Sequence, residues 1–280
     1  MPELPEVETV RRGLAENIIG KKFKDIEVLH PRATSPKSIS PLTSLRGARV
    51  KSVKRRGKFL WFELDRPEVL VGHLGMSGQF LIQPKSTQDE RHLRARFNLG
   101  RIDLRFIDQR TFGWVGVEER INNLPTCVAH IAADPFDPEF NLEETILRFQ
   151  KKRTEIKRAL LDQGVMSGVG NIYADEALWR SKIHPETRTE KMTKSRISQL
   201  ISSATEVMAE ALAVGGTSFD DLYINVNGES GNFERSLAVY GQEGEGCGRC
   251  GREIRRITFA NRSSHFCPKC QPTPRANGNR

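Results

Sequence analysis

Two pairs of closely spaced cysteines near the C-terminal end constrain the fold of this chain more than any other feature. Two residues separate Cys247 from Cys250 and Cys267 from Cys270, and 16 residues lie between the pairs. Four thiolates at this spacing typically hold one Zn²⁺ in a closed tetrahedral site, which leaves no open position for catalysis. The sequence therefore predicts one structural zinc ion on a β-hairpin, and we expect no organic cofactor.

The N-terminal residues and the cysteine content indicate where the protein works. Met1 to Glu6 are acidic where a signal peptide is basic, and they lack its apolar stretch. No apolar run approaches the roughly 20 residues that cross a bilayer. A cytosolic chain is not expected to use its cysteines as a disulfide scaffold, and Cys127 is interpreted as a lone thiol. We expect a cytoplasmic monomer with no membrane partner.

An excess of positive charge favours nucleic acid as the partner. The net charge is +9, with 44 basic and 35 acidic residues in 280, and such an excess is common in proteins with a phosphate-binding surface. Within the predicted zinc module, a single acidic residue, Glu253, stands against six basic ones: Arg249, Arg252, Arg255, Arg256, Arg262 and Lys269. Zinc ribbons also bind proteins, so charge alone leaves both kinds of partner open.

The apolar pattern of the N-terminal half predicts a helix followed by a β-rich domain. Pro5 to Glu8 can open a helix with an apolar stripe of Val7, Val10, Leu14 and Ile18. From Phe23 to about Val117 apolar and polar residues alternate, and Asn98 to Arg101 fit a hairpin turn. This pattern predicts an antiparallel β-sandwich or flattened barrel, so the fold class is α+β.

The C-terminal half is predicted to be helical up to the zinc module. Asn141 and Thr154 can cap two helices, a third is expected from Asn171 to about Trp179, and Thr193 begins the clearest one. The long loop after Gly216 is rich in Asn, Gly and Ser. We therefore expect a β-sandwich domain over residues 1–121, a linker over 122–140, a helical domain over 141–240 and a zinc ribbon with a tail over 241–280.

Five motifs resemble those of the bacterial formamidopyrimidine-DNA glycosylases, in the same order along nearly the whole chain. They are the N-terminal Met1-Pro2-Glu3-Leu4-Pro5-Glu6-Val7-Glu8-Thr9, His73-Leu74-Gly75-Met76-Ser77-Gly78, Asp108-x-Arg110-x-Phe112-Gly113, Gly168-Val169-Gly170-Asn171-Ile172-Tyr173-Ala174, and the four-cysteine ribbon. The resemblance implies a β-sandwich domain, a helix-two-turn-helix domain and a zinc hairpin. It implies a base excision repair enzyme that removes 8-oxoguanine and formamidopyrimidines from damaged double-stranded DNA and nicks the strand by β,δ-elimination.

Pro2 is the expected nucleophile. Removal of Met1 leaves a secondary α-amine on Pro2, and such an amine can attack a sugar C1′ and go on to a Schiff base. With a primary-amine pKa of about 7.8 as a stand-in, about a quarter of the amine is unprotonated near pH 7.4, against about a thousandth of a lysine. The resemblance assigns proton transfer to Glu3 and places Lys58 against the lesion nucleotide as a phosphate contact or acid.

The resemblance also assigns residues that open and hold the duplex. An enzyme that turns a base out of the stack must fill the gap, and Met76, Arg110 and Phe112 match the void-filling residues of the family. Contacts to the DNA backbone are implied for His73, His92, Lys157, Asn171 and Arg262. Two positions depart from the family pattern: Asp220 lies where a basic residue is common, and Asn261 and Ser263 flank Arg262 where glycines are common.

Two alternatives remain open from the sequence. An endonuclease VIII-like glycosylase for oxidised pyrimidines shares Pro2, Glu3 and Lys58, although Leu4 and the void-filling set favour the purine branch. A non-catalytic zinc-ribbon DNA-binding relative would keep the fold without the chemistry, and retention of Met1 would favour it. Over both alternatives, we expect a bifunctional purine glycosylase and lyase.

Overall fold

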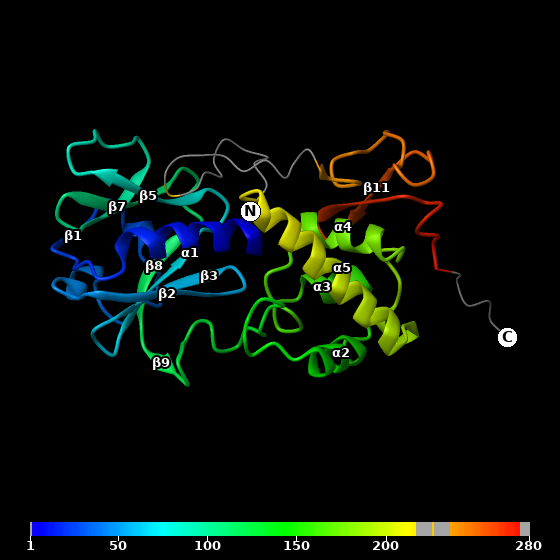
Figure 1. Ribbon diagram of the computed structural model, residues 1–280, viewed down its shortest axis with the longest axis horizontal. Helices are drawn as coiled ribbons and strands as arrows, with labels where there is room; N and C mark the ends of the chain where they lie inside the picture. Colours follow the sequence, from blue (N-terminus) through cyan, green and yellow to red (C-terminus); the bar gives the residue numbers. More distant parts are fainter. Residues whose placement is uncertain (1, 217–225, 227–235, 275–280) are drawn as a thin grey trace. The chain divides into compact units, whose positions relative to one another are not determined.

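The computed structural model describes residues 2–216, 226 and 236–274 (Figure 1). The expected loop over residues 217–233, with Asp220, lies outside the described residues apart from Val226. Internal contacts divide the chain into two compact units. The first contains the described residues of Met1–His130 and Ala211–Glu234, and the second those of Ile131–Glu210 and Arg235–Arg280. No helix in the described part is long and apolar enough to cross a membrane.

The described part of the first unit contains two four-stranded sheets, which confirm the expected antiparallel β-sandwich. One sheet has the order β1 (Asp25–Val28), β6 (Leu93–Asn98), β7 (Ile102–Asp108) and β5 (Gly78–Pro84). The other has the order β2 (Val50–Arg56), β3 (Phe59–Leu64), β4 (Val69–His73) and β8 (Trp114–Glu118). Phe62 and Phe80 face each other from the two sheets, with ring centroids 5.8 Å apart. These buried rings are part of the core that joins the layers.

Helix α1 (Leu4–Ile18) packs against β2, β3 and β5 of the sandwich (Figure 1). The helix begins one residue before the expected start, because Glu3 acts as its N-cap and Pro5 lies in the first turn, where a missing N–H costs nothing. The expected apolar stripe of Val7, Val10, Leu14 and Ile18 is buried in the core. The amphipathic pattern therefore placed this helix correctly.

Shorter elements complete the first unit. They are the 3₁₀ turns η1 (Pro31–Ala33) and η2 (Leu42–Leu45) and the two-residue strands β9 (Arg120–Ile121) and β10 (Leu124–Pro125). The predicted turn after Asn98 is confirmed, since β6 ends at Asn98 and β7 begins at Ile102. Gly100 in that turn has a φ of 109°, a conformation that only glycine adopts easily.

The second unit is helical, with α2 (Leu142–Lys151), α3 (Ile156–Leu161), α4 (Asn171–Arg180), η3 (Thr189–Lys191) and α5 (Lys194–Ala213), of which the last three residues belong to the first unit. The Asn141 side chain accepts a hydrogen bond from the Glu144 N–H at 3.0 Å, so the predicted cap of α2 is confirmed. Seven members of the predicted α5 stripe are buried, namely Ile197, Leu200, Ile201, Ala204, Val207, Met208 and Ala211. The predicted start of this helix is confirmed by Thr193, whose hydroxyl accepts from the Arg196 N–H.

The predicted cap of α3 was wrong by one residue. Glu155, not Thr154, is the N-cap residue of α3. The backbone around these residues pairs with an extended segment instead, because Glu155 forms an isolated antiparallel bridge with Arg188. The Thr154 hydroxyl donates to the Glu155 carboxylate at 2.9 Å. A tertiary pairing that local sequence does not reveal therefore replaced the threonine cap.

The C-terminal module is a β-hairpin of β11 (Arg255–Phe259) and β12 (Arg262–Phe266). The two strands pair antiparallel from Arg255 opposite Phe266 to Phe259 opposite Arg262. Ala260 and Asn261 form the turn with φ angles of 45° and 62°, which suits a tight two-residue hairpin turn. The turn therefore carries Arg262 directly at the tip.

Candidate active site and DNA-binding elements

The N-terminal residues are held by the helix that they precede. Pro2 is buried, and Glu3 is only 3% exposed. The Glu3 N–H donates to Glu6 Oε2 at 2.9 Å, and the Glu3 carboxylate accepts from the Glu6 N–H in a capping box. Gly216 lies against Glu6, since a Cβ on this glycine would be 2.9 Å from Glu6 Oε1. The expected nucleophile and its neighbouring carboxylate thus lie at the positive end of α1.

Lys58 lies in a two-residue turn, with Gly57, between β2 and β3. Arg55 connects this turn to α1, because its Nε donates to Glu8 Oε2 at 3.1 Å and its Nη1 donates to the Gly57 carbonyl at 3.0 Å. Burial would raise the pKa of Glu8, but hydrogen bonds and ion pairs with Arg11 and Arg55 outweigh it and lower the pKa to about 2. Glu8 is therefore ionised at neutral pH, and it ties the lysine-bearing turn to the first turns of α1.

His73 ends β4 next to this turn and is neutral at physiological pH. Burial against the Phe59 and Trp114 rings, and secondly the positive charge of Lys58, lower its pKa to about 4. Its Nδ1 accepts the Gly75 N–H at 3.1 Å. Because a neutral imidazole has one donor and one acceptor nitrogen, the proton is on Nε2. His73 can therefore offer an uncharged donor to a phosphate oxygen.

The three predicted void-filling residues lie on two loops at one end of the sandwich. Met76 lies on the loop between β4 and β5, and Arg110 and Phe112 lie on the loop between β7 and β8. Phe112 is 57% exposed, which is unusual for a phenylalanine, and the Arg110 guanidinium carbon lies 5.5 Å from its ring centroid. The loops touch closely, because a Cβ on Gly75 would lie 2.4 Å from the Gly113 nitrogen.

His92 precedes β6 in the same unit and is partly buried. Its Nδ1 lies 3.4 Å from an Arg94 guanidinium nitrogen, and its carbonyl accepts from the Asp108 N–H at 3.0 Å. The first unit thus contains all the predicted site residues up to Phe112, although no contact among the described residues joins His92 directly to Pro2.

The four cysteines come together in the second unit as predicted. Their Sγ atoms lie within 4.8 Å of one another, and the Cys250 and Cys267 sulfurs are 3.5 Å apart. Sulfur atoms around Zn²⁺ at bonds of about 2.3 Å lie about 3.8 Å apart in a tetrahedron, so the cluster fits one zinc ion. Trp179 donates from its indole N–H to Cys247 Sγ at 3.4 Å. The cysteines, and no other described groups, form such a metal-binding cluster.

Lys157 and Asn171, the predicted backbone-binding residues of the helical domain, both contact the zinc hairpin. The Lys157 ammonium donates to the Ser263 carbonyl at 3.0 Å, and the Asn171 amide donates to the same oxygen at 3.0 Å. Lys157 is fully buried and pairs with Asp175 at 2.6 Å. Arg262, by contrast, is exposed at the tip of the hairpin, next to Ser263.

Three family models match the chain. The "Formamidopyrimidine-DNA glycosylase N-terminal domain" matches residues 1–115, the "Formamidopyrimidine-DNA glycosylase H2TH domain" matches residues 131–222, and the "Zinc finger found in FPG and IleRS" matches residues 244–273. The chain belongs to the formamidopyrimidine-DNA glycosylase family. The family signatures thus cover both units and the zinc hairpin.

Relatives in this family match over nearly their whole length. The formamidopyrimidine-DNA glycosylase of a Nocardioides species is 53% identical over 98% of this chain and 96% of its own. That of Rhodococcus jostii is 54% identical over 98% and 97%. A solved complex of Lactococcus lactis Fpg with an abasic site containing DNA has a TM-score of 0.86 at 35% identity, with 97% of this chain and 100% of that chain covered.

One helix of this glycosylase-family chain makes contacts with the zinc module that sequence reasoning missed. Asn171, Asp175 and Trp179 recur every fourth residue along one face of α4, and all three bond to the zinc module. The neighbouring Glu176 accepts the N–H groups of Ala238, Val239 and Tyr240, in each case at about 3 Å. Hydrogen-bonding side chains at this spacing were the available signal for such contacts. On most helices, however, a face of this kind is exposed to solvent.

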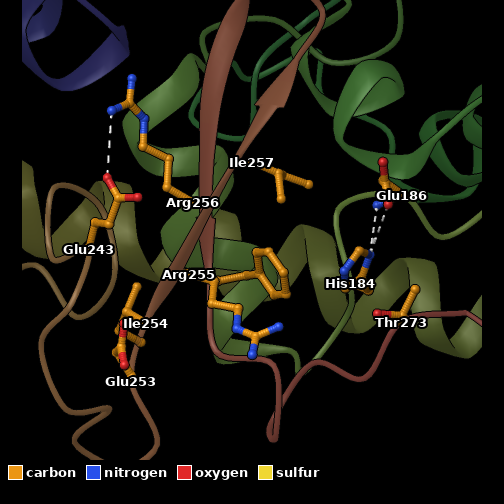
Figure 2. A pocket seen from close by; sticks show the side chains of 10 residues that line it. His184, Glu186, Glu243, Glu253, Ile254, Arg255, Arg256, Ile257 and Thr273 are labelled. Carbon is orange, nitrogen blue, oxygen red and sulfur yellow. Dashed lines mark hydrogen bonds and ion pairs between the residues drawn. The ribbon is translucent and has the colours of Figure 1, made fainter.

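A pocket of about 340 Å³ on the second unit does not coincide with the predicted site (Figure 2). Its walls carry one ion pair, Arg256 with Glu243 at 3.5 Å, and His184, whose pKa is lowered by burial, lies 3.9 Å from Glu186. The rest of the lining is mixed, with the apolar Ile254, Ile257 and Phe266 beside the polar Glu253, Arg255 and Thr273. None of the predicted catalytic or DNA-binding residues lines this pocket.

Proposed function

We propose that this protein is a bifunctional DNA glycosylase and abasic-site lyase of base excision repair that removes oxidised purines from double-stranded DNA. The observation that carries the proposal is the buried Pro2, which directly precedes a Glu3 carboxylate held by the start of α1. Membership of the formamidopyrimidine-DNA glycosylase family over both units supports it. A related protein has been solved in complex with carbocyclic 8-oxo-G containing DNA.

Pro2 supplies the nucleophile in this proposal. Its secondary amine forms a bond to C1′ of the damaged nucleotide, and the bond from C1′ to the base breaks with its electron pair leaving on the base. The Glu3 carboxylate takes the proton that the amine nitrogen loses and gives it to the sugar ring oxygen as the ring opens, which leaves a cationic Schiff base between Pro2 and C1′. Loss of a C2′ proton then expels the 3′ phosphate, and a second elimination expels the 5′ phosphate.

Lys58 and His73 serve the phosphates of the lesion nucleotide in this proposal. Lys58 offers a cation from the turn between β2 and β3, and His73 offers an uncharged N–H because its pKa is about 4. A neutral donor beside a lysine avoids placing two positive charges together. His92 is proposed as a further backbone contact from the same unit.

The second unit is proposed to grip the DNA backbone. Arg262 supplies exposed guanidinium donors, which pair well with phosphate oxygens. Asn171 and Lys157 support this grip, and Lys157 does so through the hairpin, since its ammonium is buried against Asp175 and Ser263. Cys247, Cys250, Cys267 and Cys270 would hold the structural Zn²⁺ that keeps the hairpin folded.

Oxidised pyrimidines are a second candidate substrate class. Wild-type Lactococcus lactis Fpg has been solved in complex with oxidised pyrimidine containing DNA, and it is 35% identical to this chain. The void-filling set Met76, Arg110 and Phe112 still favours purines as the main substrate. We also propose that the protein acts as a monomer in the bacterial cytoplasm. Its relatives in Nocardioides and Rhodococcus support a bacterial source. The domains are proposed to follow the expected boundaries at residues 121, 140 and 240.

Incision of a panel of labelled duplexes tests the proposal. The duplexes carry 8-oxoguanine, a formamidopyrimidine, an oxidised pyrimidine or no lesion, each paired and otherwise identical. We expect incision of both purine lesions at single-turnover rates above that of the pyrimidine, and no incision of undamaged DNA. A protein that binds the duplexes but incises none would favour the non-catalytic relative, and a preference for the pyrimidine would favour the endonuclease VIII-like reading.

A further inference from the structure

The two loops that carry the void-filling residues meet at one buried carboxylate. Asp108 is the last residue of β7 and is 0% exposed. Its Oδ1 accepts from the Ser77 hydroxyl at 2.5 Å and from the Arg110 N–H at 3.1 Å. Its Oδ2 accepts from the Gly113 N–H at 2.7 Å. One side chain thus joins the loop before β5 to both ends of the loop between β7 and β8.

Ser77 is the second member of this arrangement. Its side chain is buried, and its oxygen accepts the same Arg110 N–H at 2.9 Å while its own proton points to Asp108. The hydroxyl therefore donates to the carboxylate and accepts from the neighbouring loop. Met76 directly precedes Ser77, so the backbone that presents Met76 is tied to the backbone that presents Arg110.

The loop between β7 and β8 needs this support because its backbone is strained. Thr111 has a φ of 55°, in the left-handed region that β-branched residues rarely adopt. It lies between two exposed residues of the loop, Arg110 and Phe112. Asp108 accepts hydrogen bonds from the N–H groups on either side of the strained stretch, those of Arg110 and Gly113.

We propose that Asp108, together with Ser77, is a positioning residue for duplex opening. It does not touch the DNA; it fixes Met76, Arg110 and Phe112 in one arrangement before the DNA arrives. A loop that is already ordered loses less entropy when it enters the base stack. The inference rests on the proposed function. In it, the Asp108 carboxylate supports the step in which a paired base is turned out of the duplex.

Replacement of Asp108 with asparagine tests this inference. An amide has one acceptor oxygen and turns an NH₂ group toward the three donors, so at least one buried donor loses its partner. We expect single-turnover incision of a paired 8-oxoguanine to fall about ten- to a hundredfold, the size expected from an unsatisfied buried donor. Cleavage of a preformed abasic site, where less unstacking is needed, should fall less than about threefold.

Asp103→Asn is the matched control. Asp103 lies at the other end of β7, is 1% exposed and accepts from the Asn98 amide at 3.0 Å. It therefore undergoes the same chemical change at a buried site of the same strand, away from the two loops. Its thermal transition should fall, but the ratio of the paired-lesion rate to the abasic-site rate should match that of the parent.

Ser77→Ala is a second, smaller change that keeps the carboxylate. It should shift the same rate ratio in the same direction as Asp108→Asn, and it decides the question if Asp108→Asn does not fold. Equal losses on both substrates, or an unchanged ratio in the folded variants, would overturn the role of Asp108. A parent protein that binds but never incises the paired lesion would instead overturn the proposed function, so the two failures are distinguishable.

Discussion

The ammonium nitrogen of Lys157 lies 2.6 Å from Asp175 Oδ1, and neither side chain is exposed to solvent. The same carboxylate accepts from the Ser264 hydroxyl and from the His265 N–H, each at 2.9 Å. A buried charge is tolerated only when its partners are in place. The pair therefore joins α3 and α4 to strand β12 and fixes the strand that begins with Arg262.

Lys157→Met should loosen the hairpin. Removal of one member of a buried ion pair leaves an uncompensated charge, at a cost of about 3–5 kcal/mol. The variant should unfold at lower temperature and bind duplex DNA more weakly. The double variant Lys157→Met/Asp175→Asn should recover part of the lost stability, since no charge remains buried and the amide oxygen can still accept from Ser264 or His265.

Lys152→Met is the control for this prediction. Lys152 pairs with Asp162 at 2.6 Å as well, but its side chain is 44% exposed. Exposed pairs contribute about 0–1 kcal/mol, so the thermal transition should hardly change. A Lys157→Met protein as stable as the Lys152→Met protein would contradict the structural role of the buried pair.

Cys267→Ser should remove the zinc ion and unfold the hairpin locally. A module this small has too little core to fold without its metal. The first unit has its own core between two sheets, so its thermal transition should change little. Zinc content, calorimetry and DNA affinity measured on one preparation check this, and a zinc-free protein that binds damaged duplex as tightly as the parent would contradict it.

Arg262→Ala separates the arginine from the metal. The exposed side chain lies outside the cysteine cluster, so zinc content should stay at the parent value. Affinity for DNA should fall, and the slope of log affinity against log salt should become shallower by about one unit, as for one lost phosphate contact. An unchanged salt slope would show that Arg262 does not meet a phosphate.

The lowered pKa of His73 predicts a specific pH dependence of stability. In the unfolded chain this side chain takes up a proton near pH 6.5, whereas in the folded protein it does so at about 4. Because the unfolded state binds the extra proton between these values, the free energy of unfolding should fall as the pH is lowered from 6.5 to 4. The His73→Gln variant keeps an acceptor for the Gly75 N–H. Its free energy of unfolding should fall less between pH 6.5 and pH 4. Urea titrations across it compare the two proteins, and identical pH profiles would contradict the assignment.

Much of the fold follows from residue patterns. Alternation over β6 and β7, the stripe of α5 and the cysteine spacing each predicted an element, because burial imposes a period on apolar residues. The start of α1 was predicted one residue late, since Glu3 was considered for its chemistry and not as a cap. The predicted Thr154 cap was wrong because the bridge between Glu155 and Arg188 sets the backbone conformation there.

The supporting polar groups could not be predicted in the same way. Asp108, Asp175 and Glu176 are charged residue types, which are usually exposed, so nothing local marks them as buried. Their role depends on backbone N–H groups that only the folded chain brings near. The catalytic roles of Pro2 and Glu3 were proposed from one motif and remain a prediction. The contacts to DNA and the domain boundaries are predictions as well.

The most direct test is borohydride trapping followed by mapping of the cross-linked residue. The protein is incubated with a paired 8-oxoguanine duplex, reduced and digested, and the modified peptide is sequenced by mass spectrometry. We predict that Met1 is absent and that the reduced sugar is attached to the Pro2 nitrogen, since Schiff base formation requires a free amine. Attachment to a lysine such as Lys58, or incision of the duplex with no trapped complex, would contradict the central claim that Pro2 is the nucleophile.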